Sequence, residues 1–434
     1  MNWILAMPLE LRMVALFVIG LFLGGLLNLG IYRLAYAPRA ISPWSARLPM
    51  APPRRLFDCL PVVGWCALRR EASLHGAGFW VRPLVIEIVT GGLLAALYWW
   101  EIGERGLLTD GFKVFLDLPP NAALRRETLV ALHAVFLAHA FLIPFLIVAS
   151  FIDLDEKTIP DAVTVPGALV GLVLAAVLPT SLLPIVIPGA DGPAGVANPR
   201  LEFLTLAGMG NWPWQSVASL AIGIACLWLW CIGLMTRIWR TRHGWRMAVR
   251  IFGARLARDP MTKWLAILGL VGTAAIAVVW HFDASHWQGL LTALVGMAAG
   301  GLLIWIVRIV GSAILGREAM GFGDVTLMAM IGAYLGWQSC FVVFFLAPFA
   351  GAAIGLAQWL TSRDPEIRFG PFLSLAAMVT IVLWADIWQR LLPLIEMGWI
   401  LAAILGVCLV MMVPLLIIVR AIGDWIRGGP ASER

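Results

Sequence analysis

Apolar stretches long enough to cross a bilayer follow one another along nearly the whole chain, with polar loops between them. At about 20 residues for each crossing, this pattern predicts about eleven spanning helices and therefore an all-α polytopic membrane protein. The predicted spans are residues 13–34, 81–100, 129–152, 162–188, 215–236, 262–281, 288–310, 325–337, 339–361, 372–392 and 396–421.

Composition and charge agree with this class of protein. Of the 434 residues, 61% are hydrophobic and 13% are charged, whereas a soluble domain has roughly 25% charged residues. The net charge of +6 comes mostly from Arg residues in loops, so it indicates membrane orientation and not nucleic-acid binding.

Two Arg-rich loops, 35–82 and 237–263, fall on the same side of the predicted bundle. By the positive-inside rule that side is cytoplasmic, which places the N-terminus outside and the C-terminus inside. No small-residue cleavage site follows the first apolar run, so we expect it to be retained as a spanning helix. The six Cys residues form no C-x-x-C pair and favour neither a zinc site nor a disulfide framework.

Aspartates stand where apolar segments end. Asp153, Asp155 and Asp161 follow one such segment, and Asp324 lies between two others. An ionisable side chain at membrane depth is costly and therefore indicates function. For Asp155 and Asp161 a cap or interfacial role is the stronger interpretation, because Asp is favoured where helices begin. We expect His133 and His139 to be packed and not metal ligands.

Asp153 and Asp324 together could form the catalytic pair of an aspartyl protease. Two neighbouring carboxylates cannot both ionise easily, so one is charged and one protonated over a broad pH range. The charged group can take a proton from water while the other donates a hydrogen bond to the scissile carbonyl. Gly321 and Gly323, without a Cβ, would let a substrate backbone approach Asp324, or would serve close helix packing.

The block Phe-Ile-Asp153-Leu-Asp155, then Ile159-Pro160-Asp161, and the block Met320-Gly321-Phe322-Gly323-Asp324 resemble the type IV prepilin peptidases, which are GxGD intramembrane aspartyl proteases. Weaker matches occur in the same order along the chain, at 25–34, 82–87 and 368–371. The resemblance implies an endopeptidase in the bacterial inner membrane that cuts the leader from type IV prepilins or pseudopilins of type II secretion at the cytoplasmic face. It implies no cofactor for proteolysis, with Asp153 and Asp324 catalytic and Gly321, Gly323 and Asp161 shaping the site.

Members of this family commonly also methylate the new N-terminus with S-adenosylmethionine, and many carry two C-x-x-C pairs for zinc in the first cytoplasmic loop. This chain has only Cys59 and Cys66 there, and it reads Leu-His75-Gly-Ala-Gly where the second pair is expected. We therefore expect peptidase chemistry without zinc, and the sequence leaves methylation undecided.

The two aspartates are also farther apart in sequence than the family pattern allows. The predicted regions are N-terminal helices with the basic loop (1–128), a first catalytic helix pair (129–188), an insertion (189–287), a second catalytic core (288–392) and an additional C-terminal helix (393–434). Within the insertion, Trp245, Val249, Phe252 and Leu256 predict an amphipathic segment on the membrane surface, beside lipid. The alternatives are a transporter or channel that uses the intramembrane aspartates, and an inactive scaffold homologue.

Overall fold

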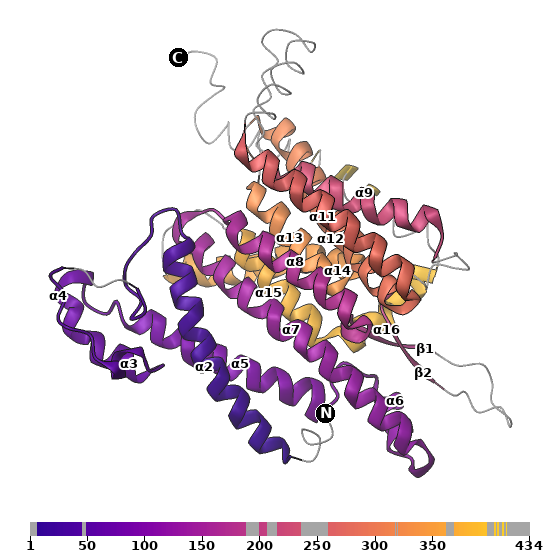
Figure 1. Ribbon diagram of the computed structural model, residues 1–434, viewed down its shortest axis with the longest axis horizontal. Coiled ribbons are helices and arrows are strands. Elements are labelled where there is room, and N and C mark those ends of the chain that lie inside the picture. Colours follow the sequence, from indigo (N-terminus) through magenta and orange to yellow (C-terminus); the bar gives the residue numbers. More distant parts are fainter. Residues whose placement is uncertain are drawn as a thin grey trace, which may run out of the picture.

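The fold is nearly all helical, as predicted. The computed structural model describes residues 7–45, 49–187, 199–205, 215–235, 259–316, 318, 320–361 and 369–396, with a few single positions between 403 and 414. The helices associate in one bundle, with α2 and α5 on one flank beside the short helices α3 and α4, and α9 and α11 on the opposite flank (Figure 1). Helices α7, α8, α12 and α13 form the centre.

The regular elements follow the chain in this order. The main helices are α2 (Leu9–Leu34), α3 (Val63–Leu68), α4 (Ala72–His75), α5 (Val81–Tyr98), α6 (Asp110–Asp117), α7 (Ala122–Glu156), α8 (Asp161–Val177), α9 (Val217–Leu234), α11 (Pro260–Phe282), α12 (Ala284–Leu315), α13 (Phe322–Leu335), α14 (Trp337–Thr361), α15 (Phe369–Val382) and α16 (Trp384–Glu396). Two short strands, β1 (Pro184–Ile187) and β2 (Arg200–Phe203), pair antiparallel.

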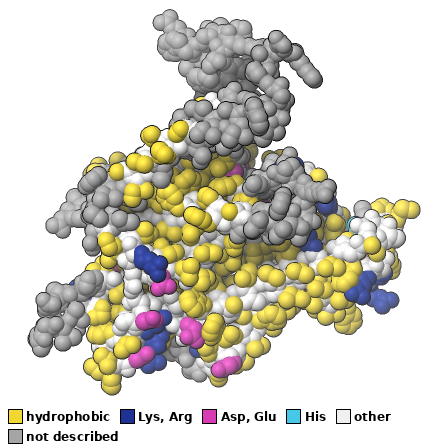
Figure 2. All heavy atoms as spheres, turned by 180° about the vertical axis from the view of Figure 1, so that it is seen from behind, with side chains coloured by type: hydrophobic (Ala, Val, Ile, Leu, Met, Phe, Trp, Pro, Cys, Tyr) yellow, Lys and Arg dark blue, Asp and Glu magenta, His cyan; other side chains and the backbone are white. Residues whose placement is uncertain are grey.

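Among the described residues, six helices are long and apolar enough to cross a bilayer, and up to seven if a bent pair counts as one span. Helices α8, α13 and part of α14 are apolar but shorter, so the predicted count of eleven is not confirmed. The apolar side chains of Leu11, Val18, Phe22 and Leu26 in α2 are about half exposed, and their spacing places them on one helix face. Figure 2 shows a large apolar area over the face drawn, with charged side chains gathered in a few patches. Lipid would cover such a surface.

Two predicted spans are wrong in extent. The segment predicted as 162–188 is helical only to Val177, because Pro179 and Pro184 lead the chain into a turn and strand β1. The predicted span 372–392 bends by 86° between α15 and α16. Asp386, Gln389 and Arg390 fall in the second part, and a straight span would carry them into the membrane. The predicted amphipathic segment and most of 396–421 lie outside the described residues.

The central contact between α12 and α13 depends on small residues. A Cβ on Gly296 would lie 2.2 Å from the carbonyl oxygen of Gly332, and a Cβ on Gly332 would lie 2.1 Å from that of Gly296. Neither position has room for a side chain, so the two backbones approach directly, as in membrane helix pairs that use small residues. This packing fixes α13, which carries Asp324 in its first turn.

Candidate active site

Asp153 lies in the last turn of α7 and is 6% exposed. The helix ends because Lys157 adopts a left-handed conformation with φ of 60°, while its N–H still bonds to the Asp153 carbonyl. Ile159 and Pro160 follow, and proline disfavours helical conformation in the residue before it. The sequence Lys157 to Pro160 therefore terminates α7 directly after the buried carboxylate.

Asp324 lies in the first turn of α13 and is 7% exposed. Its carboxyl group accepts a hydrogen bond from the backbone N–H of Gly321, the residue just before the helix. Asp153 is close enough to Asp324 for the two carboxyl groups to act on each other electrostatically. The fold thus brings together the two aspartates that the sequence predicts as a pair.

The two glycines next to Asp324 have different surroundings. Among the described residues, a Cβ on Gly321 would meet only the Asp324 carboxylate, at 3.6 Å, and the backbone nitrogen of Gly323, at 4.0 Å. A Cβ on Gly323 would instead lie 2.7 Å from the Cβ of Ile159. In the described part of the chain, the open approach to Asp324 is therefore beside Gly321, whereas the segment that follows α7 fills the space beside Gly323.

Helix α15 also contributes to the site. A Cβ on Gly370, in its first turn, would lie 2.7 Å from Oδ2 of Asp153. Sequence reasoning noted this glycine only as part of a turn that resembles the family pattern, and missed its contact with Asp153. Asp161 is the exposed first residue of α8. Among the described residues, no hydrogen bond or ion pair joins Asp161 to Asp153 or Asp324, and its place suits an acidic residue at a helix N-terminus.

The last turn of α7 is attached to two other helices. Arg82 of α5 donates to both carboxylate oxygens of Asp155, at 2.7 and 2.9 Å, and its guanidinium lies 4.9 Å from the ring of Phe151. On another side, Glu156 accepts hydrogen bonds from the backbone N–H groups of Tyr36 and Ala37, which follow α2. Asp155 and Glu156 thus hold the turn that carries Asp153.

If the chain has the peptidase activity that its sequence predicts, replacing Arg82 with Gln should lower kcat about ten-fold with little change in KM, since small displacements of a catalytic group are costly. The measurement is steady-state cleavage, with Arg105→Gln as the matched control, because Arg105 makes an equivalent two-bond pair with Asp117 at 2.9 and 2.9 Å. Equal rates for the two variants would contradict a positioning role for Arg82.

The Arg-rich first loop is held by ion pairs and hydrogen bonds. Asp58 is buried and pairs with Arg70. Burial alone would raise the pKa of Asp58, but the hydrogen bonds from Arg70 and from the backbone of Arg55 outweigh it and lower that pKa. Arg54 lies 3.6 Å from Glu71 and donates to the carbonyl groups of Ser42, Pro43 and Ser45.

The zinc ligands of the family do not fit this loop. Cys59 and Cys66 are exposed free thiols. His75 lies 3.6 Å from the Glu71 carboxylate, and its ring packs 5.0 Å from that of Phe79. Within the described part of the chain, no group of three His, Cys, Asp or Glu residues has a geometry that could hold a metal ion.

Protease resistance of this loop should depend on Asp58 and not on metal. Because its pKa is lowered in the folded loop, ionised Asp58 stabilises the loop above about pH 4. That contribution disappears as the pH falls through the lowered pKa. Asp58→Asn should cost about 1–3 kcal/mol and remove this pH dependence, measured by limited proteolysis. A loss of resistance on adding a metal chelator to wild type would contradict the prediction.

The two histidines of α7 both have side-chain partners. Nε2 of His133 lies 3.0 Å from the hydroxyl of Tyr98, and Nδ1 of His139 lies 2.6 Å from the Glu101 carboxylate. His139 and Glu101 are completely buried. These pairs join α7 to α5 and the π-helical turn that follows it, so both rings are packed, as expected.

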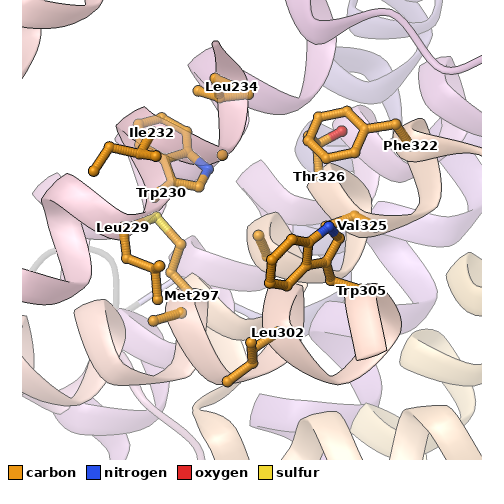
Figure 3. A pocket seen from close by; sticks show the side chains of 14 residues that line it. Leu229, Trp230, Ile232, Leu234, Met297, Leu302, Trp305, Phe322, Val325 and Thr326 are labelled. Carbon is orange, nitrogen blue, oxygen red and sulfur yellow. The ribbon is translucent and has the colours of Figure 1, made fainter. Parts of the chain in front are cut away.

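An apolar cavity of about 110 Å³ lies between α9, α12 and α13. Figure 3 shows side chains of α9, such as Leu229 and Ile232, facing Phe322 and Val325 of α13. Phe322, Val325 and Ala329 recur at helical spacing and share one face of α13, whereas Asp324 lies on a different face. Neither Asp153 nor Asp324 is among the residues that line the cavity.

The fold and the site define a multi-pass membrane protein with two buried, interacting aspartates at the ends of two central helices. Residues 252–356 match the type IV leader peptidase family, so the predicted resemblance to this family is confirmed over this part of the chain. The match includes Gly321, Gly323 and Asp324 but not Asp153.

Curated relatives agree with this assignment. A prepilin leader peptidase/N-methyltransferase from Aeromonas hydrophila is 36% identical over 97 residues, which are 22% of this chain and 33% of the relative. A protein of the same name from Pseudomonas aeruginosa is 38% identical over 136 residues, 30% of this chain and 43% of the relative. The chain thus spans about a third of the length of the first relatives it matches. No solved structure is significantly similar.

Proposed function

We propose that the protein is an aspartyl endopeptidase that cleaves the leader from pilin-like precursors, with Asp153 and Asp324 as the catalytic pair. The observation that carries this proposal is that two buried aspartates, far apart in sequence, meet at helix ends beside an open approach at Gly321. The names of the relatives supply the substrate class.

The mechanism follows from two carboxyl groups that share one proton. The ionised aspartate takes a proton from a water molecule, which attacks the scissile carbonyl carbon. The protonated aspartate donates a hydrogen bond to the carbonyl oxygen and stabilises the negative charge that develops there. Proton transfer to the leaving nitrogen then breaks the C–N bond, and no metal or covalent enzyme intermediate takes part.

The proposed site faces the cytoplasm in the bacterial inner membrane, with the N-terminus on the periplasmic side. This orientation rests on the first Arg-rich loop, which carries more basic than acidic residues and follows α2. The hydrogen bonds from Tyr36 and Ala37 to Glu156, and the pair between Arg82 and Asp155, tie both ends of this loop to the end of α7. The substrate would therefore present its basic leader to the same side as the catalytic pair.

The experiment is cleavage by the purified full chain of a precursor with a short basic leader before an apolar segment. We expect cleavage at the junction of leader and apolar segment, and none of a matched precursor whose leader junction is scrambled. Failure to cut a panel of such precursors would contradict the proposal. Because the relatives' names include N-methyltransferase, S-adenosylmethionine is added in parallel, and a methyl-sized mass increase would add that activity.

A further inference from the structure

Ile159 lies where three parts of the candidate site meet: the connection between α7 and α8, the start of α13 and the first turn of α15. It follows α7, precedes α8, and is 7% exposed. Its neighbour Pro160 has no N–H and a fixed φ, so the backbone at this point has little freedom. Isoleucine is also branched at Cβ, which restricts its first side-chain torsion. The residue is therefore a stiff group in a constrained segment.

Gly323 of α13 packs directly on Ile159. A Cβ at Gly323 would lie 2.7 Å from the Ile159 Cβ and 3.0 Å from both its backbone nitrogen and oxygen. These distances are shorter than ordinary contact, so only glycine allows the approach. Gly323 precedes Asp324, so the backbone that carries one carboxylate rests on the backbone of Ile159.

Gly370 of α15 packs on the other end of the same side chain. A Cβ at Gly370 would lie 2.8 Å from Cδ1 of Ile159 and 2.7 Å from Oδ2 of Asp153. The first turn of α15 thus contacts Ile159 and the other carboxylate together. Ile159 occupies the space between two glycines, one beside each aspartate.

We propose that Ile159 is a positioning residue that sets the separation of Asp153 and Asp324, with Gly323 and Gly370 providing the space for it. This role rests on the proposed peptidase function. A shift of about 1 Å in catalytic groups can cost on the order of 10²-fold in rate. Shortening Ile159 lets α13 and α15 move toward it, which changes the geometry of the pair without removing either carboxylate.

The first test compares Ile159→Ala with Ile143→Ala. Both isoleucines are buried: Ile143 lies within α7 and is 2% exposed, and Ile159 follows α7. Both variants should lose stability. Only Ile159→Ala should lower kcat, on the order of 10²-fold, with KM nearly unchanged. Equal kcat values for the two variants, with wild type active, would overturn the positioning role and leave the proposed function standing.

A second test uses paired substitutions. Ile159→Val removes Cδ1 and keeps Cβ. The double variant Ile159→Val with Gly370→Ala should therefore cleave about ten-fold faster than Gly370→Ala alone. Added to Gly323→Ala, Ile159→Val should not raise the cleavage rate, because the new methyl group at position 323 meets the Cβ and the backbone that valine retains. Gly351→Ala, which places a methyl 2.9 Å from Phe372 of α15, controls for disturbed packing of that helix. Recovery in both glycine variants, or in neither, would overturn the proposal.

A readout independent of catalysis separates this inference from the proposed function. In a chain without its native cysteines, Asp153→Cys with Asp324→Cys should form a disulfide under mild oxidation. Adding Ile159→Ala should change the rate of its formation, while adding Ile143→Ala should not. If wild type cuts no precursor, the proposed function fails, and this comparison still decides whether Ile159 fixes the distance. An unchanged cross-linking rate would overturn its role.

Discussion

Replacing either Asp153 or Asp324 with Asn is expected to lower kcat for precursor cleavage by about 10⁴-fold, and replacing both should cost little more. In the proposed mechanism the two carboxyl groups act as one unit, because neither can perform its part of the proton transfer alone. Asn keeps the size of the side chain but can neither take up nor release the required proton. The measurement is single-turnover cleavage by purified variants.

Asp110→Asn is a suitable control for this experiment, since the Asp110 side chain is 97% exposed on α6 and forms a local ion pair with Lys113. It should keep the wild-type rate. If the double variant lost the product of the two single effects, the aspartates would be acting independently, which contradicts a shared-proton pair.

Replacing Glu87 with Ala is expected to detach the first loop from the helices. Glu87 is 2% exposed in α5 and accepts hydrogen bonds from the Val62 backbone N–H at 2.5 Å and the Trp65 indole N–H at 2.7 Å. Each buried donor left without an acceptor costs about 1–3 kcal/mol. Hydrogen-exchange protection of α3 should therefore fall on the order of 10²-fold.

Glu87→Gln separates this effect from simple loss of charge. It keeps an oxygen that can accept from Trp65, so the loss of protection should be smaller than for the Ala variant. An equal loss of protection in both variants would mean that the charge of Glu87, and not its ability to accept hydrogen bonds, holds the loop. Unchanged protection in Glu87→Ala would contradict the structural role of this residue.

The class of fold and the aspartate pair could be predicted from the sequence because each rests on a local pattern. Apolar runs of sufficient length define helices, and a carboxylate directly after such a run is costly enough to indicate function. The sequence predicts Asp153 and Asp324 as a pair because the motifs around them are short and contiguous. The structure places both among the buried residues of the site.

The partners of these residues could not be predicted, because they come from distant segments. Nothing in the local sequence indicates that Arg82 pairs with Asp155, or that Gly370 contacts Asp153. The residues of each pair are far apart along the chain. Hydropathy also gave the wrong extent for two spans, because in each an apolar run does not form one straight helix. The run after Val177 contains prolines and becomes a strand, and the run after Phe369 bends before Asp386.

The central claim is most directly tested by mass spectrometry of the products formed from one precursor by wild type and by Asp324→Asn, with a metal chelator present. Wild type should release the leader and leave a single new N-terminus at the start of the apolar segment, and the variant should leave the precursor intact. Cleavage by the variant at the same position, or loss of wild-type cleavage in the chelator, would contradict a metal-independent aspartate pair.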